Sequence, residues 1–319
     1  FTGGDNQGII GLESVYDKYL EGTDGLILTT TDARGVEVDN IGEERKEPVA
    51  GNNLRTSLDA NIQMFAMQAA NKAYIQKEAD SVSIIVMNPS DGAVMAMVDY
   101  PEFHLNEPFQ LIEEYKEYEG TKKEQEYCNR MWRNQCISDT YEPGSPAKPM
   151  TVAAGLEEGV IGQNDTFLCD GGQVVGGYRI KCVSIYGHGI LTVEQSLMKS
   201  CNDVMMQIAA KLGIQRFAKY QKLFGMGQKT GIDLPGEAYG LIYNSDNMGP
   251  TDLAVNSFGQ SYNCTMIQMA AAFASVINGG SYYEPHVVKQ IVNDQGSVVR
   301  KIEPNLVRET VSESTSEFI

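Results

Sequence analysis

Hydrophobic positions along this chain recur with a helical spacing in several segments. The clearest segment follows Asp59, an expected N-cap, and places Ile62, Phe65, Ala69 and Ala73 on one predicted helix face. A Thr-x-x-Gln capping box opens the helix predicted from residue 192. The other predicted helices cover residues 11–20, a stretch from 145, residues 203–212, residues 265–277 and a stretch from 314.

Strand patterns flank these helices. Residues 82–87 and 93–98 are rich in apolar and β-branched residues, and the turn residues 89–92 between them predict a hairpin. A second hairpin is predicted from residues 286–292 and 297–302. Because strands and helices are grouped rather than alternating one by one, the expected fold class is α+β. Shorter strands are predicted at 26–31 and 54–58, with a linker or exposed hairpin over 39–53.

The composition narrows the possible functions. The 319 residues carry a formal charge of −17 with a pI of about 4.6, which argues against nucleic acid and anionic membrane surfaces as partners. The six cysteines lack Cys-x-x-Cys spacing and the three histidines are scattered, so we predict no metal site and no cofactor. The glycines within 171–177 are interpreted as turns, because no strand–turn–helix pattern of a nucleotide loop surrounds them.

A Ser-x-x-Lys arrangement is the first candidate for chemistry. Ser145 and Lys148 follow the Pro143-Gly144 turn and stand at the start of a helical pattern. Residues three apart share a helix face, so the Lys148 amine is expected beside the Ser145 hydroxyl. A helix N-terminus also offers unpaired backbone N–H groups. This pattern points to acyl transfer, but it is common by chance and needs a second signal.

The second signal is Ser200-Cys201-Asn202, which lies 55 residues after Ser145 and between two helical patterns. Ser-x-x-Lys followed at this distance by Ser-x-Asn resembles the penicilloyl-serine transferases. The flanking segments are similar to class B penicillin-binding proteins over nearly the whole chain. These segments are Gly8–Gly22, Arg130–Asn134, Tyr141–Ser145, Gly187–Gly189, Thr230–Glu237, Ser257–Gln260, Thr265–Ala270 and Asn278–Gly280.

The resemblance implies a D,D-transpeptidase of the division or sporulation type that cross-links peptidoglycan stem peptides. It implies Ser145 as nucleophile and half of an oxyanion hole through its backbone N–H, with Lys148 as general base. Ser200 is implied to relay a proton, and Asn202 to bind the substrate amide. β-Lactam antibiotics are implied to acylate the same serine.

The resemblance also implies an organisation. Residues 1–50 are expected to be the C-terminal part of an N-terminal pedestal and its linker, and residues 51–319 the transpeptidase domain, an antiparallel sheet with a helical cluster. A membrane anchor outside this chain and an extracytoplasmic location are expected. A glycosyltransferase and division or sporulation proteins are the expected partners, and nucleic acid is not.

Two departures from the family pattern stand out. Pro146-Ala147 replaces the usual Thr and larger apolar residue, and proline is tolerated in a first helical turn. The family's third motif, Lys-Thr/Ser-Gly on a strand, is matched only by Lys229–Gly231, which lies too close to Ser200 and runs into a different family segment. We therefore expect the true motif after Ile319, and expect a chain without it to be impaired.

Some alternatives stay open at this stage. Cys182 and Cys201 could form a disulfide that distorts the site, Cys169 and Cys182 are a rival pair, and free thiols are the third possibility. His188 is interpreted as a structural residue of a turn. The competing functions are a non-catalytic cell-wall scaffold with this fold and a β-lactamase or D,D-carboxypeptidase.

Overall fold

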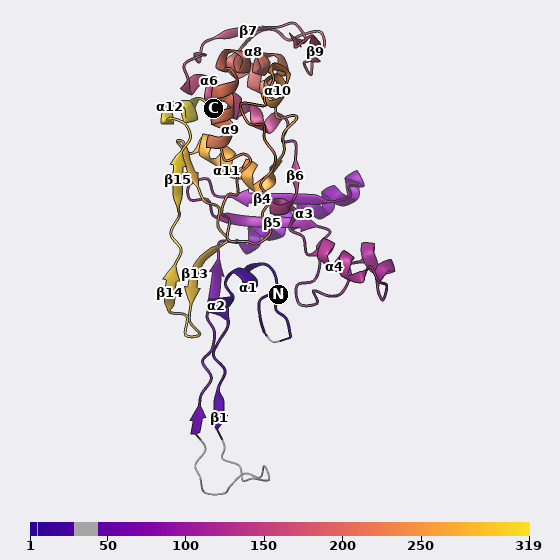
Figure 1. Cartoon of the computed structure of the whole chain (residues 1–319), viewed down its shortest axis with the longest axis vertical. Coiled ribbons are helices and arrows are strands. Elements are labelled where there is room, and N and C mark those ends of the chain that lie inside the picture. Colours follow the sequence, from indigo (N-terminus) through magenta and orange to yellow (C-terminus); the bar gives the residue numbers. More distant parts are fainter. Residues whose placement is uncertain (5, 29–43) are drawn as a thin grey trace. The chain divides into compact units, whose positions relative to one another are not determined.

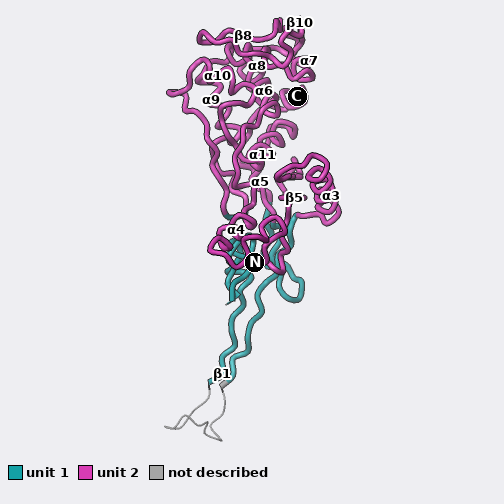
Figure 2. The backbone as a smooth tube through the Cα atoms, turned by 90° about the vertical axis from the view of Figure 1, so that its right-hand side faces the viewer, with its two compact units in different colours: residues 1–57, 233–235, 288–303 teal, residues 58–232, 236–287, 304–319 magenta. Residues whose placement is uncertain are grey.

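A computed structural model describes residues 1–4, 6–28 and 44–319 of the chain. These residues form two compact units, coloured separately in Figure 2. Unit 1 contains residues 1–57, 233–235 and 288–303, and unit 2 contains the remainder. Compactness alone does not define a domain, so the predicted boundary between residues 50 and 51 stays a prediction.

Unit 1 is built around a three-stranded antiparallel sheet in the order β14-β13-β3. Asp233 anchors this unit, because its carboxylate accepts hydrogen bonds from the Tyr16 hydroxyl at 2.8 Å and from the Val288 N–H at 2.9 Å. The hairpin predicted at 286–302 is confirmed. The helix predicted over 11–20 is split at Tyr16. The elements are α1 (Leu12–Val15), α2 (Asp17–Leu20), β1 (Leu26–Leu28), β2 (Glu44–Lys46), β3 (Asn53–Thr56), β13 (Val288–Val292) and β14 (Val298–Lys301).

Two predictions fall partly outside the described residues. The strand predicted at 26–31 is observed as β1, and its last residues, 29–31, lie outside the described part of the chain. The same holds for residues 39–43 of the predicted linker or exposed hairpin. The described remainder of that segment contains β2, which pairs antiparallel with β1.

The hairpin β4 (Val82–Met87) and β5 (Val94–Tyr100) in unit 2 forms as predicted, with helix α3 (Ala60–Lys77) packed on β5 (Figure 1). Asp59 caps α3 as predicted, accepting from two backbone N–H groups. The predicted apolar face is wrong at Phe65, which is 63% exposed, and at Ala69, which is also exposed, while Ala66 and Ala70 are buried. Gln63 takes an inward position instead, because its amide pairs with both the N–H and the carbonyl of Met97 on β5 at 2.9 Å.

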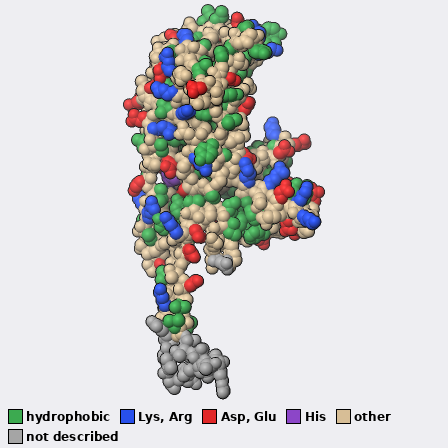
Figure 3. Space-filling view, viewed as in Figure 1, with side chains coloured by type: hydrophobic (Ala, Val, Ile, Leu, Met, Phe, Trp, Pro, Cys, Tyr) green, Lys and Arg blue, Asp and Glu red, His purple; other side chains and the backbone are tan. Residues whose placement is uncertain are grey.

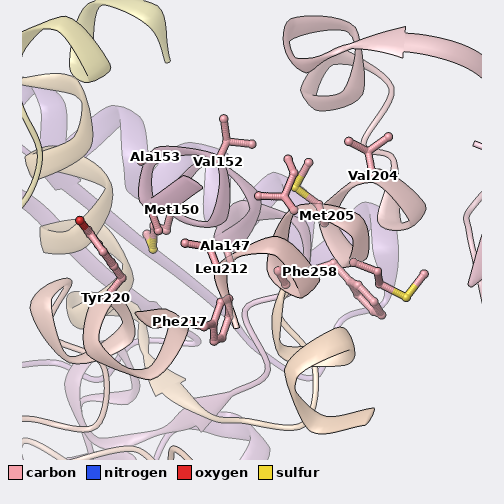
Figure 4. Packing of buried hydrophobic residues seen from close by; sticks show 14 of the residues in the cluster. Ala147, Met150, Val152, Ala153, Val204, Met205, Leu212, Phe217, Tyr220 and Phe258 are labelled. Atoms are coloured by element: carbon pink, nitrogen blue, oxygen red, sulfur yellow. The ribbon is translucent and has the colours of Figure 1, made fainter. Parts of the chain in front are cut away.

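The helices of unit 2 enclose its main core. Figure 4 shows Met150, Met205 and Phe217 from α6, α8 and α9 gathered in this core. The capping boxes that open α7 and α11 both form. Each large apolar side chain buried here contributes about 1.5–3 kcal/mol to folding, so α6, buried on nearly all sides, is firmly held. The helices are η1 (Glu113–Tyr118), α4 (Glu124–Met131), α5 (Gln135–Ser138), η2 (Ser145–Ala147), α6 (Lys148–Glu157), α7 (Val193–Met198), α8 (Asn202–Leu212), α9 (Ile214–Leu223), α10 (Pro250–Asn256), α11 (Met266–Ile277) and α12 (Glu313–Phe318).

Short antiparallel strand pairs complete unit 2. The interpretation of the glycines within 171–177 as turns is correct for Gly171, in the bend between β7 and β8, and for Gly176 and Gly177, in the turn between β8 and β9. It is wrong for Gly172, which begins strand β8. No helix among the described residues is both long and apolar enough to cross a membrane. The strands are β6 (Thr140–Tyr141), β7 (Thr166–Cys169), β8 (Gly172–Val175), β9 (Tyr178–Lys181), β10 (Gly189–Thr192), β11 (Cys264–Thr265), β12 (Ser281–Tyr283) and β15 (Leu306–Glu309).

The strands β7 to β9 are tied to helix α8 by one buried carboxylate. Asp203 is fully buried and accepts from the N–H groups of Asp170 and Gly172 and from the amides of Gln173 and Gln207, at 2.6–3.2 Å. Hydrogen bonds to a charged acceptor are stronger than neutral ones. The β7–β8 turn is therefore fixed against the first turn of α8.

The surface of unit 2 over β7 to β10 carries several exposed apolar side chains. Figure 3 shows hydrophobic side chains gathered at this end of the molecule, and acidic and basic side chains interspersed over the rest of the visible face. Tyr186 is 92% exposed, on the loop between β9 and β10. The others are Leu168, Val174, Tyr178, Val183, Ile185 and Ile190.

Candidate active site

Ser145 stands where an irregular turn becomes a helix. Gly144 has a φ of 62°, which glycine adopts without strain, and the chain then enters the short helix η2 and continues directly into α6. Pro146 and Pro149 occupy first-turn positions of η2 and α6, where a missing N–H costs no hydrogen bond. The predicted tolerance of Pro146 is confirmed. The Ser145 N–H makes no hydrogen bond to a described residue, as is usual at the start of a helix.

Three of the four predicted site residues form one hydrogen-bonded group. The Lys148 amine donates to Ser145 Oγ at 3.2 Å and to Ser200 Oγ at 2.7 Å, and it also donates to the Ser200 carbonyl at 2.7 Å. Ser200 Oγ in turn donates to Ser145 Oγ at 2.9 Å. We call these three residues the Ser–Lys–Ser group. Ser145 itself is exposed, so its hydroxyl is accessible to a substrate.

The Lys148 amine is held in an environment that makes its neutral form more accessible than that of an exposed lysine. Its side chain is only 2% exposed and no carboxylate pairs with it among the described residues. Burial lowers the pKa of Lys148 from its ordinary value of 10.5 to about 8, and the electrostatic influence of the nearby Cys182 and Cys201 sulfurs partly opposes this shift. A lysine with such a pKa can accept a proton from a neighbouring hydroxyl near neutral pH.

Ser200 is held at the end of helix α7 in a conformation that glycine normally adopts. Its φ is 49°, in the left-handed region. The Ser200 N–H donates to the Leu197 carbonyl and the Cys201 N–H to the Ser196 carbonyl, each at 2.9 Å. These two bonds form a Schellman motif, in which glycine is preferred at the position of Ser200. A serine there costs about 1–2 kcal/mol, and it places a hydroxyl against Lys148.

Asn202 lies close to this group in sequence but is not part of its hydrogen-bonded network. It is the first residue of α8 and half-buried, and its side chain makes no hydrogen bond to a described residue. Its amide is therefore available to a ligand. The role predicted for Asn202 in binding a substrate amide stays a prediction.

The segment after α10 supports the nucleophile turn from behind. The Gly144 N–H donates to the Gly259 carbonyl at 2.8 Å, and the Ser261 N–H donates to the Glu142 carboxylate at 2.9 Å. Gly259 has a φ of 84°, and a Cβ on it would lie 2.0 Å from the Gly144 carbonyl oxygen. The sequence analysis named Ser257–Gln260 among the segments that resemble the family, without indicating this role. The only sequence feature that could have indicated this contact is the glycine at position 259.

Lys229 does not join the Ser–Lys–Ser group. It is exposed in an irregular segment, with its amine 5.1 Å from the centre of the Tyr239 ring. The N–H and hydroxyl of the following Thr230 both donate to the buried Glu237 carboxylate at 2.6 Å. The Lys229–Gly231 segment thus has a structural environment and lies outside any strand.

Four side chains from separate segments meet beside Ser200. The sequence analysis considered pairs among the three cysteines, but it did not foresee that His188 joins them. Their ligand atoms all lie within 4.8 Å of one another. All six cysteines are free thiols, which was the third possibility, and neither candidate disulfide is formed in this structure. The cluster could not be recognised in the sequence, because its residues are 13, 6 and 13 positions apart and no short motif joins them. We call Cys169, Cys182, His188 and Cys201 the Cys/His cluster.

Comparison with known proteins adds to this geometry. Residues 82–319 match the family described as "Penicillin binding protein transpeptidase domain", and residues 1–56 match "Penicillin-binding Protein dimerisation domain". The chain belongs to the penicillin-binding protein family. Its fold is the transpeptidase fold of that family, since Penicillin binding protein 3 from Mycobacterium tuberculosis aligns with a TM-score of 0.81 at 25% identity, over 99% of this chain and 64% of that one.

Two curated relatives are similar to this chain over part of their own length. Stage V sporulation protein D of Bacillus subtilis is 33% identical over 100% of this chain and 47% of its own length. Peptidoglycan D,D-transpeptidase FtsI of Escherichia coli is 30% identical over 91% of this chain and 46% of its own length. The chain therefore spans about half the length of the curated relatives it matches.

Replacing Gly259 with Ala tests the support behind the nucleophile. The added Cβ must push the Gly144 backbone away, and a shift of the neighbouring Ser145 by about 1 Å slows a reaction about a hundredfold. The measurement is the rate of covalent labelling by a fluorescent penicillin. Gly279→Ala is the matched control, because Gly279 has a similar φ of 88° with open space around it. Equal labelling rates in both variants would show that the Gly259–Gly144 contact does not position Ser145.

Replacing Ser200 separates backbone strain from hydroxyl chemistry. Ser200→Gly removes the hydroxyl and relieves the left-handed strain, whereas Ser200→Ala removes the hydroxyl alone. We expect both variants to label slowly with penicillin, and the glycine variant to be more stable than the alanine variant by about 1 kcal/mol in chemical denaturation. A glycine variant that is no more stable than the alanine variant would show that position 200 is not strained.

Proposed function

We propose that this chain carries the acyl-transfer site of a peptidoglycan D,D-transpeptidase. The observation that carries the proposal is the Ser–Lys–Ser group. In it, the accessible Ser145 hydroxyl contacts the buried Lys148 amine, which has no carboxylate partner among the described residues. The names of the relatives support the same reaction, since FtsI is described as a peptidoglycan D,D-transpeptidase. The substrate is a stem peptide that ends in two D-alanines.

The proposed first step forms an acyl-enzyme. The neutral Lys148 amine takes the Ser145 proton while Ser145 Oγ bonds to the carbonyl carbon between the two D-alanines. Negative charge develops on the carbonyl oxygen, to which the Ser145 N–H donates. The C–N bond then breaks, and the proton passes from Lys148 through the Ser200 hydroxyl to the leaving amine of D-alanine. The hydrogen bonds among the three side chains support this route.

The second step transfers the acyl group to an amine of a neighbouring stem. That amine attacks the ester carbon, loses a proton through Ser200 or Lys148, and Ser145 Oγ leaves and recovers its proton. The free amide of Asn202 is suited to bind the substrate backbone during both steps. A β-lactam reacts with Ser145 in the same way, and the amide bond that breaks is part of its ring.

The setting of the whole protein is part of the proposal. We propose an extracytoplasmic, membrane-anchored enzyme that acts with a glycosyltransferase and with division or sporulation proteins. The sporulation role is supported by the similarity to stage V sporulation protein D. We also propose residues 1–50 as part of the pedestal and residues 51–319 as part of the catalytic domain.

Fluorescent penicillin tests this function on the natural full-length protein. Wild-type protein and the control Ser90→Ala, an exposed serine in the β4–β5 turn, are expected to carry stable label, and Ser145→Ala none. Absence of label on the folded wild type would indicate the scaffold function instead. Label that is lost within minutes by hydrolysis would indicate a β-lactamase.

The acylation rate is expected to depend on pH through Lys148. Because burial lowers the pKa of this amine to about 8, its neutral fraction is small at about pH 6 and nearly complete at about pH 10. The labelling rate is therefore expected to rise through pH 8 and then level off. Lys148→Arg keeps a charged group there and is expected to label at a small fraction of the wild-type rate. A rate independent of pH across this range would contradict Lys148 as the base.

A further inference from the structure

The Cys/His cluster draws its four side chains from three separate parts of unit 2. Cys169 ends strand β7, Cys182 and His188 flank the loop after β9, and Cys201 lies between Ser200 and helix α8. The three cysteines are buried, with at most 4% of each exposed, and His188 is half-buried on a loop with exposed neighbours. The proposed acyl-transfer chemistry uses none of these four side chains.

The cluster has the dimensions of a tetrahedral metal site. The Cys182 and Cys201 sulfurs are 3.7 Å apart, and His188 Nδ1 lies 3.4 Å from the Cys169 sulfur and 3.8 Å from that of Cys182. Zinc bonds of about 2.3 Å to sulfur and about 2.0 Å to nitrogen in a tetrahedron separate the ligand atoms by about 3.5–3.8 Å. These three separations lie close to those values, and all four ligand atoms lie within 4.8 Å of one another, so small side-chain movements are enough to place them around one zinc ion.

The backbone holds the ligands in place independently of any ion. The Cys182 N–H donates to the Gly171 carbonyl at 3.0 Å, and the His188 N–H donates to the Cys169 carbonyl at 3.1 Å. The loop after β9 and the end of β7 lie so close together that a Cβ on Gly187 would be 2.3 Å from the Cys169 carbonyl oxygen. The buried Asp203 fixes the same turn to α8. A metal site needs this kind of supporting shell to orient its ligands.

Backbone N–H groups also point at the sulfur atoms. The N–H groups of Asp203 and Ser184 lie near the Cys182 sulfur, and the N–H of Val204 lies near the Cys201 sulfur. Donors aimed at sulfur stabilise thiolates, the form in which cysteine binds a metal. Three cysteines and one histidine form a common ligand set of structural zinc sites.

We propose that the Cys/His cluster binds one zinc ion and thereby fixes the loop that carries Ser200. On binding, each of the three thiols loses its proton to solvent and forms a sulfur–zinc bond, while neutral His188 binds through Nδ1. Because Cys201 directly follows Ser200, the ion anchors the strained turn that presents the Ser200 hydroxyl to Lys148. The effect on acylation rests on the proposed function, whereas metal binding itself does not.

The first test measures metal on the natural full-length protein, purified under reducing conditions. Elemental analysis is expected to find one zinc per chain. After removal of zinc with a chelator, Co²⁺ alone is expected to restore one equivalent of metal and to give the thiolate-to-cobalt absorption of a tetrahedral sulfur site. Protein without zinc that gives no such absorption on addition of Co²⁺ would overturn the proposal.

Variants locate the site. Cys182→Ser and His188→Asn are expected to bind Co²⁺ at least about a hundredfold more weakly than wild type. Cys264→Ser is the matched control, since Cys264 is fully buried outside the cluster, and it is expected to bind normally. If Cys182→Ser fails to fold, His188→Asn still decides the matter because its side chain is half-buried. Equal affinity in His188→Asn and Cys264→Ser would contradict the proposal.

The rate of thiol oxidation in air distinguishes a zinc site from a disulfide-forming pair of cysteines. Zinc-loaded protein is expected to keep its cluster thiols reduced in air, whereas the metal-free protein is free to join Cys182 to Cys201. Disulfide formation at the same rate with and without zinc would overturn the proposal. If the protein binds zinc but is not labelled by penicillin, only the proposed function is overturned. If the protein is labelled by penicillin but binds no metal, only the zinc proposal is overturned.

Discussion

The buried amine of Lys148, held between the hydroxyls of Ser145 and Ser200, is the interaction on which the rest of the site depends. An amine that is 2% exposed and has no carboxylate partner among the described residues is costly to keep charged. The packing of the other α6 residues into the main core of unit 2 offsets the free-energy cost of burying this amine (Figure 4). The core therefore fixes the base, and the two serines are brought to it by turns on either side.

Those turns have backbone conformations that only a few residues tolerate. Gly144 has positive φ before the nucleophile, Gly259 supports it at close contact, and Ser200 has positive φ where glycine is usual. Strained positions persist only where surrounding structure determines them, and they concentrate at functional sites. The buried Asp203 and the Cys/His cluster supply that surrounding structure on the Ser200 side.

Local patterns predicted much of this structure from the sequence. Helix starts with a capping side chain, such as that at Asp59, and hairpins with a turn signal were found because their determinants are neighbours in the chain. The pairing of Ser145 with Lys148 followed from helix spacing, and the contact with Ser200 was implied by the family resemblance.

Contacts between distant segments were not predictable in the same way. Gln63 lies on the inner face of α3 because it completes the hydrogen bonds of Met97, and helical periodicity cannot show such a partner. Gly259 and the Cys/His cluster depend on loops that meet only in the folded chain. Their residues carry no short motif, so the tertiary structure was needed to find them.

The most direct test of this account is the titration of the Lys148 amine itself. Nuclear magnetic resonance of protein containing ¹³C-labelled lysine, with the Lys148 signal assigned by its loss in Lys148→Arg, gives the midpoint of this titration. The account predicts a midpoint near 8, because burial disfavours the charged form. A midpoint at the ordinary lysine value of 10.5 would show that Lys148 stays charged, and would contradict its role as the base that activates Ser145.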